Sequence, residues 1–310
     1  MDRVQVMELV RSFQVGELSR REFMLQASAA LGSVALASTL LAACAPVTGP
    51  TEPVVLATQP VMGGPEPALP GVSVEMVSYA DGQGGTLSGY VARPSGQGKW
   101  PAVVVIQEWW GLNDNIKDIA QRFAAEGFVA LAPDLYHGAV VSEPNEARKL
   151  VMQLDMTTAV EEIRRGIDYL LSRSDVAGPQ VGLTGFCMGG GLTLRTALVD
   201  DRLVAAIPWY GSPLTGEEAA QAKAPIQGHY GEADSGIPVA AVRAMEEGLT
   251  AAGIPNEIYL YPGAGHAFFN DTRPSYDAAA AELAWSRTLA WLRNYLGEAG
   301  NAPVTGDRVL

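Results

Sequence analysis

Residues 181–191 read Val-Gly-Leu-Thr-Gly-Phe-Cys-Met-Gly-Gly-Gly. The first four form a short apolar run typical of a buried strand, and a stretch with helical periodicity follows at 190–199. Between them, Gly185 and Gly189 flank Cys187 in a Gly-x-Cys-x-Gly pattern. Glycines flank a nucleophile at such a place because the turn is strained and the following helix must approach the strand closely. The stretch therefore predicts a strand, a sharp turn that presents Cys187, and a helix.

The rest of the body alternates between short apolar runs and stretches with helical periodicity. The runs predict strands at 102–106, 129–132, 181–184, 204–208, 225–230 and 257–261. The periodic stretches predict helices at 113–126, 157–172, 190–199, 239–252 and 275–296. Continuous apolar runs suit parallel strands buried on both faces, whereas looser alternation at 72–79 and 86–92 predicts an antiparallel hairpin. The predicted fold is α/β, with a doubly wound, mostly parallel sheet that has helices on both faces. Ligands in such sheets bind at the carboxyl ends of the strands.

A cysteine at this turn is a candidate nucleophile. The N-terminus of the following helix favours the thiolate, which is the form that attacks carbonyl groups. The alternative is a buried structural thiol, which behaves as a small hydrophobic side chain.

Partners for a nucleophile follow in the expected chain order of nucleophile, acid and histidine, each after its own strand. Asp234 and His266 each follow a predicted strand, and His266 lies in a glycine-flanked turn. Of the other two histidines, His137 lies in a predicted loop and His229 lies inside a predicted strand, which favours a structural role for His229. We therefore expect His266 to hold the proton of Cys187 and later activate a water molecule, with Asp234 fixing its tautomer.

An acid, Glu108, closes the predicted strand 102–106 and precedes Trp109. A carboxyl at the end of a buried strand loses hydration energy unless it has a partner or a task. Its expected neighbour is Cys187, whose pKa it would raise, so Glu108 either keeps the thiol neutral at rest or takes its proton. The alternative is a surface salt bridge. The backbone N–H groups of Trp109 and Met188 are the expected oxyanion donors.

The N-terminal region predicts export. Arg20 and Arg21 precede an uncharged stretch, 25–43, which ends before Cys44. This order resembles a twin-arginine signal followed by a bacterial lipobox, whose cysteine is lipidated and becomes the mature N-terminus. We predict a signal peptide over 1–43 and a protein held by lipidated Cys44 on the outer face of the bacterial cytoplasmic membrane. The alternative is an uncleaved anchor helix.

Prolines and glycines recur through 44–71, which predicts an extended tether. The folded domain is predicted over 72–297 and a loose polar tail over 298–310. These boundaries leave one domain to carry the chemistry.

Composition limits the function further. Of the 310 residues 48% are hydrophobic, which is enough for a sizeable core. The chain has 21 Lys and Arg against 34 Asp and Glu, and the net charge of -13 disfavours binding to nucleic acid. Two cysteines cannot form a disulfide framework. The sequence leaves the oligomeric state open.

Several motifs together resemble the dienelactone hydrolase family. In the family's order they are 107–113 (QEWWGLN), 133–136 (PDLY), 185–190 (GFCMGG), 231–234 (GEAD) and 265–268 (GHAF). The resemblance covers about residues 72–297. It implies an α/β-hydrolase fold, a triad of Cys187, His266 and Asp234, and Glu108 as the acid that exchanges partners with the thiol when substrate binds. It implies no metal and no organic cofactor.

One position departs from that family's pattern. The namesake enzymes have an arginine four residues after the catalytic histidine that helps hold the substrate carboxylate, and this chain has Asn270 there. Arg273 and Arg148 could substitute for it, and solvated surface positions are the alternative for both. Aromatic residues gather at the predicted strand ends, which favours an apolar pocket and a neutral ester or lactone. The residues expected to line the pocket are Trp110, Tyr136, Phe268 and Asn270.

Two functions remain. The first is a hydrolase that cleaves a small ester or lactone through an acyl-cysteine intermediate. The second is a non-catalytic, membrane-tethered lipoprotein that binds a hydrophobic small molecule or a partner, because a fold alone does not prove activity. Reaction of Cys187 with an alkylating reagent, and its dependence on His266, distinguishes the two.

Overall fold

The structure is a computed structural model, and it describes residues 68–297. The predicted signal peptide, the lipidation of Cys44, most of the tether and the C-terminal tail lie outside the described residues. None of the helices in the described part has the length and hydrophobicity needed to cross a bilayer.

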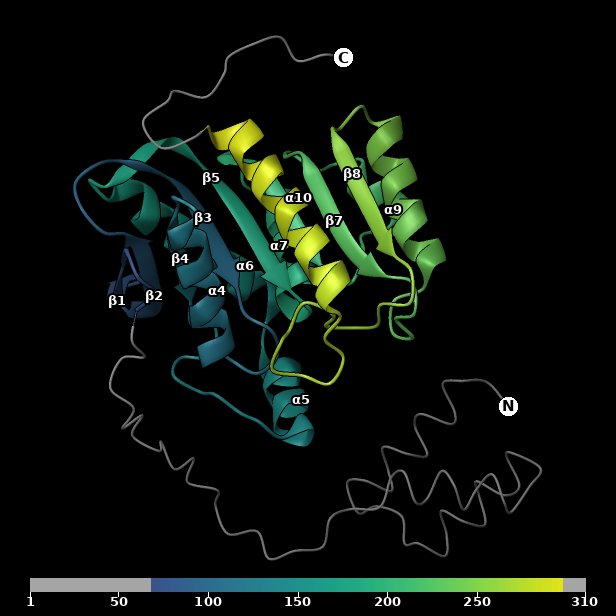
Figure 1. The fold of residues 1–310 in the computed structure, drawn as a ribbon, viewed down its shortest axis with the longest axis horizontal. Helices are drawn as coiled ribbons and strands as arrows, with labels where there is room; N and C mark the ends of the chain where they lie inside the picture. The colour runs from purple at the N-terminus through teal and green to yellow at the C-terminus, as the bar shows by residue number, and fades with distance from the viewer. Residues whose placement is uncertain (1–67, 298–310) are drawn as a thin grey trace, which may run out of the picture. The chain divides into compact units, whose positions relative to one another are not determined.

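An eight-stranded sheet forms the centre of the described part, with strand order β1-β2-β4-β3-β5-β6-β7-β8 (Figure 1). The strands are β1 (Val72–Ala80), β2 (Thr86–Pro94), β3 (Trp100–Ile106), β4 (Val129–Pro133), β5 (Val176–Phe186), β6 (Leu203–Trp209), β7 (Ile226–Gly231) and β8 (Asn256–Tyr261). β2 pairs antiparallel with both β1 and β4, and every other neighbouring pair in this sheet is parallel. The predicted N-terminal hairpin and mostly parallel sheet are confirmed.

Helices cover both faces of this sheet. They are α4 (Asp114–Ala125), α5 (Pro144–Gln153), α6 (Met156–Ser172), α7 (Met188–Ala197), α8 (Gly216–Ala219), α9 (Val239–Ala251) and α10 (Ala278–Leu296). In Figure 1, α4 and α10 lie in front of the sheet, and α6 and α7 lie behind it. The doubly wound arrangement is therefore confirmed.

Burial explains why the strands read as continuous apolar runs. Every residue of β3 and of β4 is buried, because helices pack on both sides of these strands. Two short helices were not predicted. α5 buries only Ala147, and α8 has only four residues.

The folded part begins slightly before Val72. The backbone N–H of Leu69 donates to Oε1 of Gln121 at 2.8 Å, and the N–H of Val72 donates to the carbonyl of Leu69 at 3.0 Å. Leu69 is thus anchored to α4, although the sequence assigns it to the tether.

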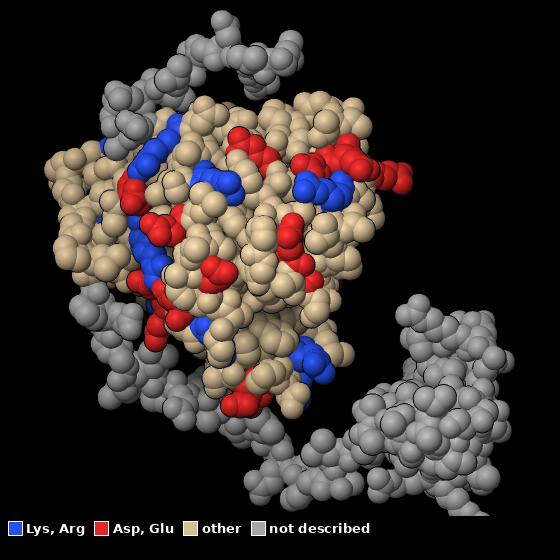
Figure 2. Space-filling model, turned by 45° about the vertical axis from the view of Figure 1, so that its right-hand side comes forward, with Lys and Arg blue, Asp and Glu red and all other residues tan. Residues whose placement is uncertain are grey.

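Charged side chains of both signs are mixed on the surface, as Figure 2 shows for one face. Arg122 lies 2.6 Å from Asp118, and Arg293 lies 2.6 Å from Glu126. Exposed pairs of this kind contribute about 0–1 kcal/mol to stability. Their basic groups already have carboxylate partners, which weakens their attraction for an external polyanion.

Three loops matter for function because each follows the carboxyl end of a parallel strand. Cys187 directly follows β5, Asp234 follows β7 and His266 follows β8. Carboxyl ends of parallel strands meet at one edge of a sheet, so the topology brings these residues toward one place.

Candidate active site

Cys187 occupies a strained turn between β5 and α7. Its φ is 54° and its ψ is -114°, a left-handed conformation that costs a non-glycine residue about 1–3 kcal/mol. Its N–H donates to the carbonyl of Trp209 at 3.0 Å. A Cβ at Gly189 would lie 2.5 Å from the carbonyl oxygen of Gln107, so only glycine lets α7 approach the end of β3 this closely. The predicted strand, turn and helix are confirmed.

Three polar side chains meet at this turn. Nε2 of His266 lies 3.1 Å from Sγ of Cys187, and Nδ1 lies 2.7 Å from Oδ2 of Asp234. The other oxygen of Asp234 accepts the N–H of Gly236 at 2.8 Å. An Nδ1–H held by a buried carboxylate leaves Nε2 as an acceptor that faces the thiol. The structure thus brings together the three residues predicted to form the triad.

The thiol of Cys187 has a pKa raised to about 12, mainly because it is buried. The negative charges of Glu108 and Asp234 raise this pKa further, whereas the backbone N–H of Met188 lowers it. From the sequence, the helix N-terminus was expected to favour the thiolate and Glu108 was expected to raise the pKa of the thiol; burial adds a larger effect. The effect of the helix N-terminus is present, but burial outweighs it, so the resting thiol is protonated at neutral pH.

Glu108 lies beside the thiol without bonding to it. Glu108 is 3% exposed as a residue, which excludes the alternative of a surface salt bridge. Nδ2 of Asn270 donates to Oε2 at 2.8 Å, and the hydroxyl of Tyr210 donates to Oε1 at 3.3 Å. Burial raises the pKa of Glu108, and the bond from Asn270 and the positive charge available at His266 oppose that rise. The charge of Glu108 raises the pKa of the Cys187 thiol, and both predicted roles for Glu108 stay predictions.

The two predicted oxyanion donors come from one residue before Cys187 in the chain and one residue after it. As the first residue of α7, Met188 has an N–H with no intrahelical acceptor, and this group interacts with the thiol of Cys187. Trp109 follows Glu108 after β3, and its ring packs edge to face against Trp110 with centroids 5.0 Å apart. The assignment of both N–H groups to an oxyanion hole stays a prediction.

Of the predicted pocket residues, Tyr136 lies near the thiol and Trp110 contacts Arg273, whose charge acts on Glu108. The hydroxyl of Tyr136 donates to Sδ of Met188 at 3.2 Å, and the charge of Cys187 contributes to the raised pKa of Tyr136. The guanidinium of Arg273 lies 3.9 Å above the ring of Trp110 as a cation–π contact. Arg273 therefore lies close to this site, and its charge also acts on Glu108.

The other two predicted pocket residues have different places. Phe268 is 0% exposed and packs against Trp209, Tyr210 and Tyr261, so it belongs to the aromatic core and does not line a pocket. Asn270 is 2% exposed and holds Glu108. Periodicity and position could not distinguish a core aromatic residue from a pocket residue in this loop.

Arg148, the second basic residue considered as a substitute, lies in α5 with an exposed side chain. This exposed position fits the alternative interpretation of Arg148, a solvated surface charge.

His229 is completely buried within β7, in agreement with its interpretation as structural. Nδ1 bonds with the hydroxyl of Tyr261 at 2.8 Å and Nε2 with the hydroxyl of Thr288 at 3.0 Å. Burial lowers the pKa of His229 to about 3, so the ring is neutral at physiological pH. His137 is exposed and lies 3.3 Å from Glu162.

Tyr210 also belongs to this site, and nothing in the sequence indicated its role. It directly follows β6 with a φ of 38°, and it is buried between Glu108 and the ring of His266. An aromatic residue at a strand end gives no signal of such a backbone conformation, so the sequence could not have indicated this contact.

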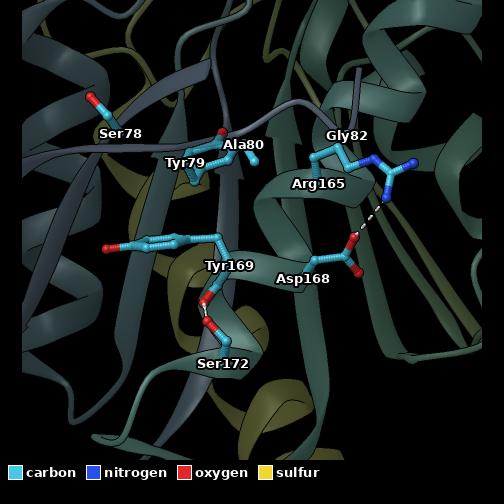
Figure 3. Close-up of a pocket in the computed structure, with 8 residues that line it drawn as sticks. All are labelled: Ser78, Tyr79, Ala80, Gly82, Arg165, Asp168, Tyr169 and Ser172. Carbon is cyan, nitrogen blue, oxygen red and sulfur yellow. Dashed lines mark hydrogen bonds and ion pairs between the residues drawn. The ribbon is translucent and has the colours of Figure 1, made fainter. Parts of the chain in front are cut away.

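A separate groove of about 410 Å³ lies between the edge strand β1 and α6. Figure 3 shows the stacked rings of Tyr79 and Tyr169 and the bond from Arg165 to Asp168 within it. The groove shares no residue with the candidate triad. It is therefore not the place where Cys187 meets a substrate.

Comparisons with known proteins identify similar sequences and folds. The sequence pattern of the dienelactone hydrolase family matches residues 87–296. A protein of Escherichia coli (strain K12) named "Putative carboxymethylenebutenolidase" is 38% identical over 70% of this chain and 85% of its own length. The protein usf of Aquifex pyrophilus is 36% identical over 72% of this chain and 99% of its own length.

A solved structure points to the same family. It is a crystal structure from Klebsiella pneumoniae, described as a "Putative Dienelactone Hydrolase", with 31% identity and a TM-score of 0.66. The match covers 72% of this chain and 100% of that chain. Sequence and fold are therefore similar over the same part of the protein.

Proposed function

Because the chain belongs to the dienelactone hydrolase family, we propose that it hydrolyses a small ester or lactone through an acyl-cysteine intermediate on Cys187. Membership makes it a dienelactone hydrolase-like hydrolase. The finer proposal concerns the nucleophile, its partners and the covalent step. It rests mainly on one observation, the chain of contacts from Sγ of Cys187 to His266 at 3.1 Å and from His266 to Asp234 at 2.7 Å.

Acylation begins from a neutral thiol. His266 accepts the thiol proton at Nε2 while Sγ of Cys187 attacks the carbonyl carbon of the ester. The carbonyl oxygen becomes an oxyanion, which the N–H groups of Met188 and Trp109 stabilise. The intermediate collapses, the carbon–oxygen bond breaks, and His266 returns its proton to the leaving alkoxide. The acyl group is then a thioester of Cys187.

Two carboxyl groups help His266 to hold the proton during this step. Asp234 accepts from Nδ1 and keeps the ring oriented. The charge of Glu108 interacts favourably with protonated His266 and unfavourably with the thiolate. While the negative charge is on sulfur, Glu108 opposes the transfer of the thiol proton to His266. Once Cys187 attacks and the charge moves to the substrate oxygen, Glu108 favours that transfer.

Deacylation uses the same histidine. A water molecule attacks the thioester carbonyl while Nε2 of His266 removes its proton. The second intermediate releases the carboxylic acid, and the proton returns to Sγ of Cys187. Each turnover consumes one water molecule and regenerates the neutral thiol.

The surroundings of the thiol favour a neutral or weakly polar substrate. Tyr136 and Trp110 supply largely apolar surfaces, and the position after the histidine that holds an arginine in the namesake enzymes is Asn270, which is already bonded to Glu108. Arg273, whose charge acts on Glu108, is stacked on Trp110. We therefore propose simple esters and lactones ahead of an anionic dienelactone.

The test compares the full chain with a Cys187→Ala variant on a short p-nitrophenyl ester and on a dienelactone. We expect turnover by the wild type and a loss of roughly 10³–10⁶-fold in kcat/KM for the variant. Mass spectrometry of the wild type mixed with substrate and quenched in acid should find the acyl group on Cys187. If both proteins are folded and equally inactive on every ester tested, the non-catalytic lipoprotein becomes the better explanation.

The proposed location is the outer face of the bacterial cytoplasmic membrane, through lipidated Cys44. This proposal rests on the order of Arg20, Arg21, the uncharged stretch and Cys44 in the sequence. A Cys44→Ala variant should lose incorporation of labelled fatty acid. Labelling that persists in this variant would contradict the proposal.

A further inference from the structure

Tyr210 occupies an unusual backbone position next to the nucleophile. It is 1% exposed, and its φ of 38° is strained for a non-glycine residue. Its N–H donates to the carbonyl of His229 at 2.8 Å, while the carbonyl of the preceding Trp209 accepts the N–H of Cys187 at 3.0 Å. The end of β6 therefore holds both the turn of the nucleophile and the side chain of Tyr210 in fixed positions.

The side chain of Tyr210 contacts two groups that act on the thiol. Its hydroxyl donates to Oε1 of Glu108 at 3.3 Å. The edge of its ring packs against the imidazole of His266, with centroids 5.2 Å apart and planes at 63°. Tyr210 is therefore a direct link between the buried carboxyl and the histidine, and it lies too deep to touch a substrate.

We propose that Tyr210 is a positioning residue for ester hydrolysis, holding Glu108 in its charged form beside Cys187 and His266. The inference rests on the proposed function. It gives Tyr210, a residue outside the triad, a part in controlling ester hydrolysis. The hydroxyl of Tyr210 remains a donor, because burial and the nearby charges of Glu108 and Cys187 raise its pKa well above the ordinary value.

Charged and titratable groups from several elements act on Glu108 and Cys187. Those that act on Glu108 are His266, Tyr210 and Arg273, and those that act on Cys187 are Glu108 and Asp234. The raised pKa of Tyr136 also reflects Cys187. Of these groups, Tyr210 is a neutral hydroxyl that donates directly to Glu108. Removing the hydroxyl of Tyr210 therefore changes how readily Glu108 is protonated, and it neither introduces nor deletes a charged side chain.

Loss of the Tyr210 hydroxyl should raise the rate at which Cys187 is labelled and lower kcat. Without this donor the charged form of Glu108 is less favourable, so its pKa rises and more of it is neutral at a given pH. Neutral Glu108 no longer opposes the thiolate, so Cys187 should react faster with iodoacetamide. Neutral Glu108 also no longer stabilises protonated His266, so kcat should fall.

The experiment uses Tyr210→Phe, which keeps the ring against His266 and removes only the hydroxyl. Tyr230→Phe is the matched control, because Tyr230 is also buried and its hydroxyl has no hydrogen-bond partner. For Tyr210→Phe we expect iodoacetamide labelling of Cys187 to become about 3- to 10-fold faster at pH 8–9, and kcat to fall by a similar factor with KM unchanged. Tyr230→Phe should match the wild type in both assays.

A double variant tests whether the effect passes through Glu108. In a Glu108→Gln background, Tyr210→Phe should change the labelling rate by less than about 2-fold, because the charge it controls is gone. Equal effects in the two backgrounds would overturn the proposal, as would unchanged labelling in Tyr210→Phe. Labelling does not need turnover, so this result stays separate from a failure of the hydrolase proposal.

Discussion

The side-chain amide of Asn270 donates a 2.8 Å hydrogen bond to the buried carboxyl of Glu108. The amide oxygen of Asn270 accepts from the backbone N–H of Thr272 at 3.1 Å and from its hydroxyl at 2.6 Å. These bonds fix which end of the amide faces Glu108. Glu108 is thus held by a neutral donor at the position where the family's namesake enzymes have a cation. At this position there is therefore no cation that a substrate carboxylate could bind in place of Glu108.

Replacement of Asn270 by alanine should reduce both stability and activity. Oε2 of Glu108 would lose its donor inside the protein, which costs about 1–3 kcal/mol of unfolding free energy. The pKa of Glu108 would rise further, and kcat should fall by about 5- to 20-fold because protonated His266 loses a favourable charge. Urea denaturation and steady-state kinetics measure the two effects.

Asn115→Ala is the control, since Asn115 donates to Asp271 at 3.3 Å on the surface. It should change the unfolding free energy by less than about 0.5 kcal/mol. An Asn270→Ala variant as stable and active as Asn115→Ala would show that the bond to Glu108 has no role.

Two neighbouring glycines of α7 should respond differently to alanine. At Gly189 the added Cβ would lie 2.5 Å from the carbonyl of Gln107 and 2.6 Å from that of Ile106, so α7 or β3 must move. At Gly191 the nearest atom would be 3.7 Å away, an ordinary contact with Ser212. Gly189→Ala should therefore lose at least about 10-fold in kcat/KM and about 1–3 kcal/mol of stability.

Gly191→Ala should remain active, with unchanged or slightly increased stability, because alanine favours a helix by about 1 kcal/mol over glycine. Equal losses in kcat/KM and melting temperature for the two variants would contradict the close-approach argument.

Sequence periodicity was sufficient for most of the sheet. β3 and β4 are buried throughout, so their apolar runs directly report the parallel strands. The nucleophile, Asp234 and His266 were predicted from their positions after strands, because parallel topology places such positions at one edge. α5 was not predicted; it buries only Ala147, so it contributes little to the core that makes the other helices recognisable.

The chemistry around the thiol depended on distances that no spacing encodes. The helix N-terminus before Met188 was visible in the sequence, but the burial that dominates the pKa of Cys187 depends on packing. Asn270 was considered only as a pocket residue, because its bond to Glu108 joins residues 162 positions apart. The backbone N–H of Tyr210 likewise bonds with the carbonyl of His229 in β7, a contact that no sequence spacing indicates.

The raised pKa of Cys187 should make stability depend on alkaline pH. Its folded-state value of about 12 exceeds the unfolded value near 8.5, so the folded state binds the thiol proton more tightly. The resulting stability is complete below about pH 8.5 and is lost as the pH rises toward 12. Between pH 8 and pH 10 the unfolding free energy of the wild type should fall by about 1–2 kcal/mol more than that of Cys187→Ala.

Urea denaturation of the two proteins at both pH values measures this difference, and other titrating groups cancel in the comparison. Parallel changes in the two proteins would mean that the resting thiol is not stabilised in its neutral form.

Phe268 should contribute to stability and not to substrate selection. Its side chain is completely buried, and its ring centroid lies 5.0 Å from that of Tyr261 and 5.5 Å from that of Tyr210. Phe268→Leu should cost about 1–3 kcal/mol through lost packing, with KM for esters of different acyl length changed by less than about 2-fold. Trp110→Leu, at a residue expected to line the pocket, should instead change KM with acyl length. If Phe268→Leu alters the order of preferred acyl chains as Trp110→Leu does, Phe268 contacts the substrate after a rearrangement of the loop.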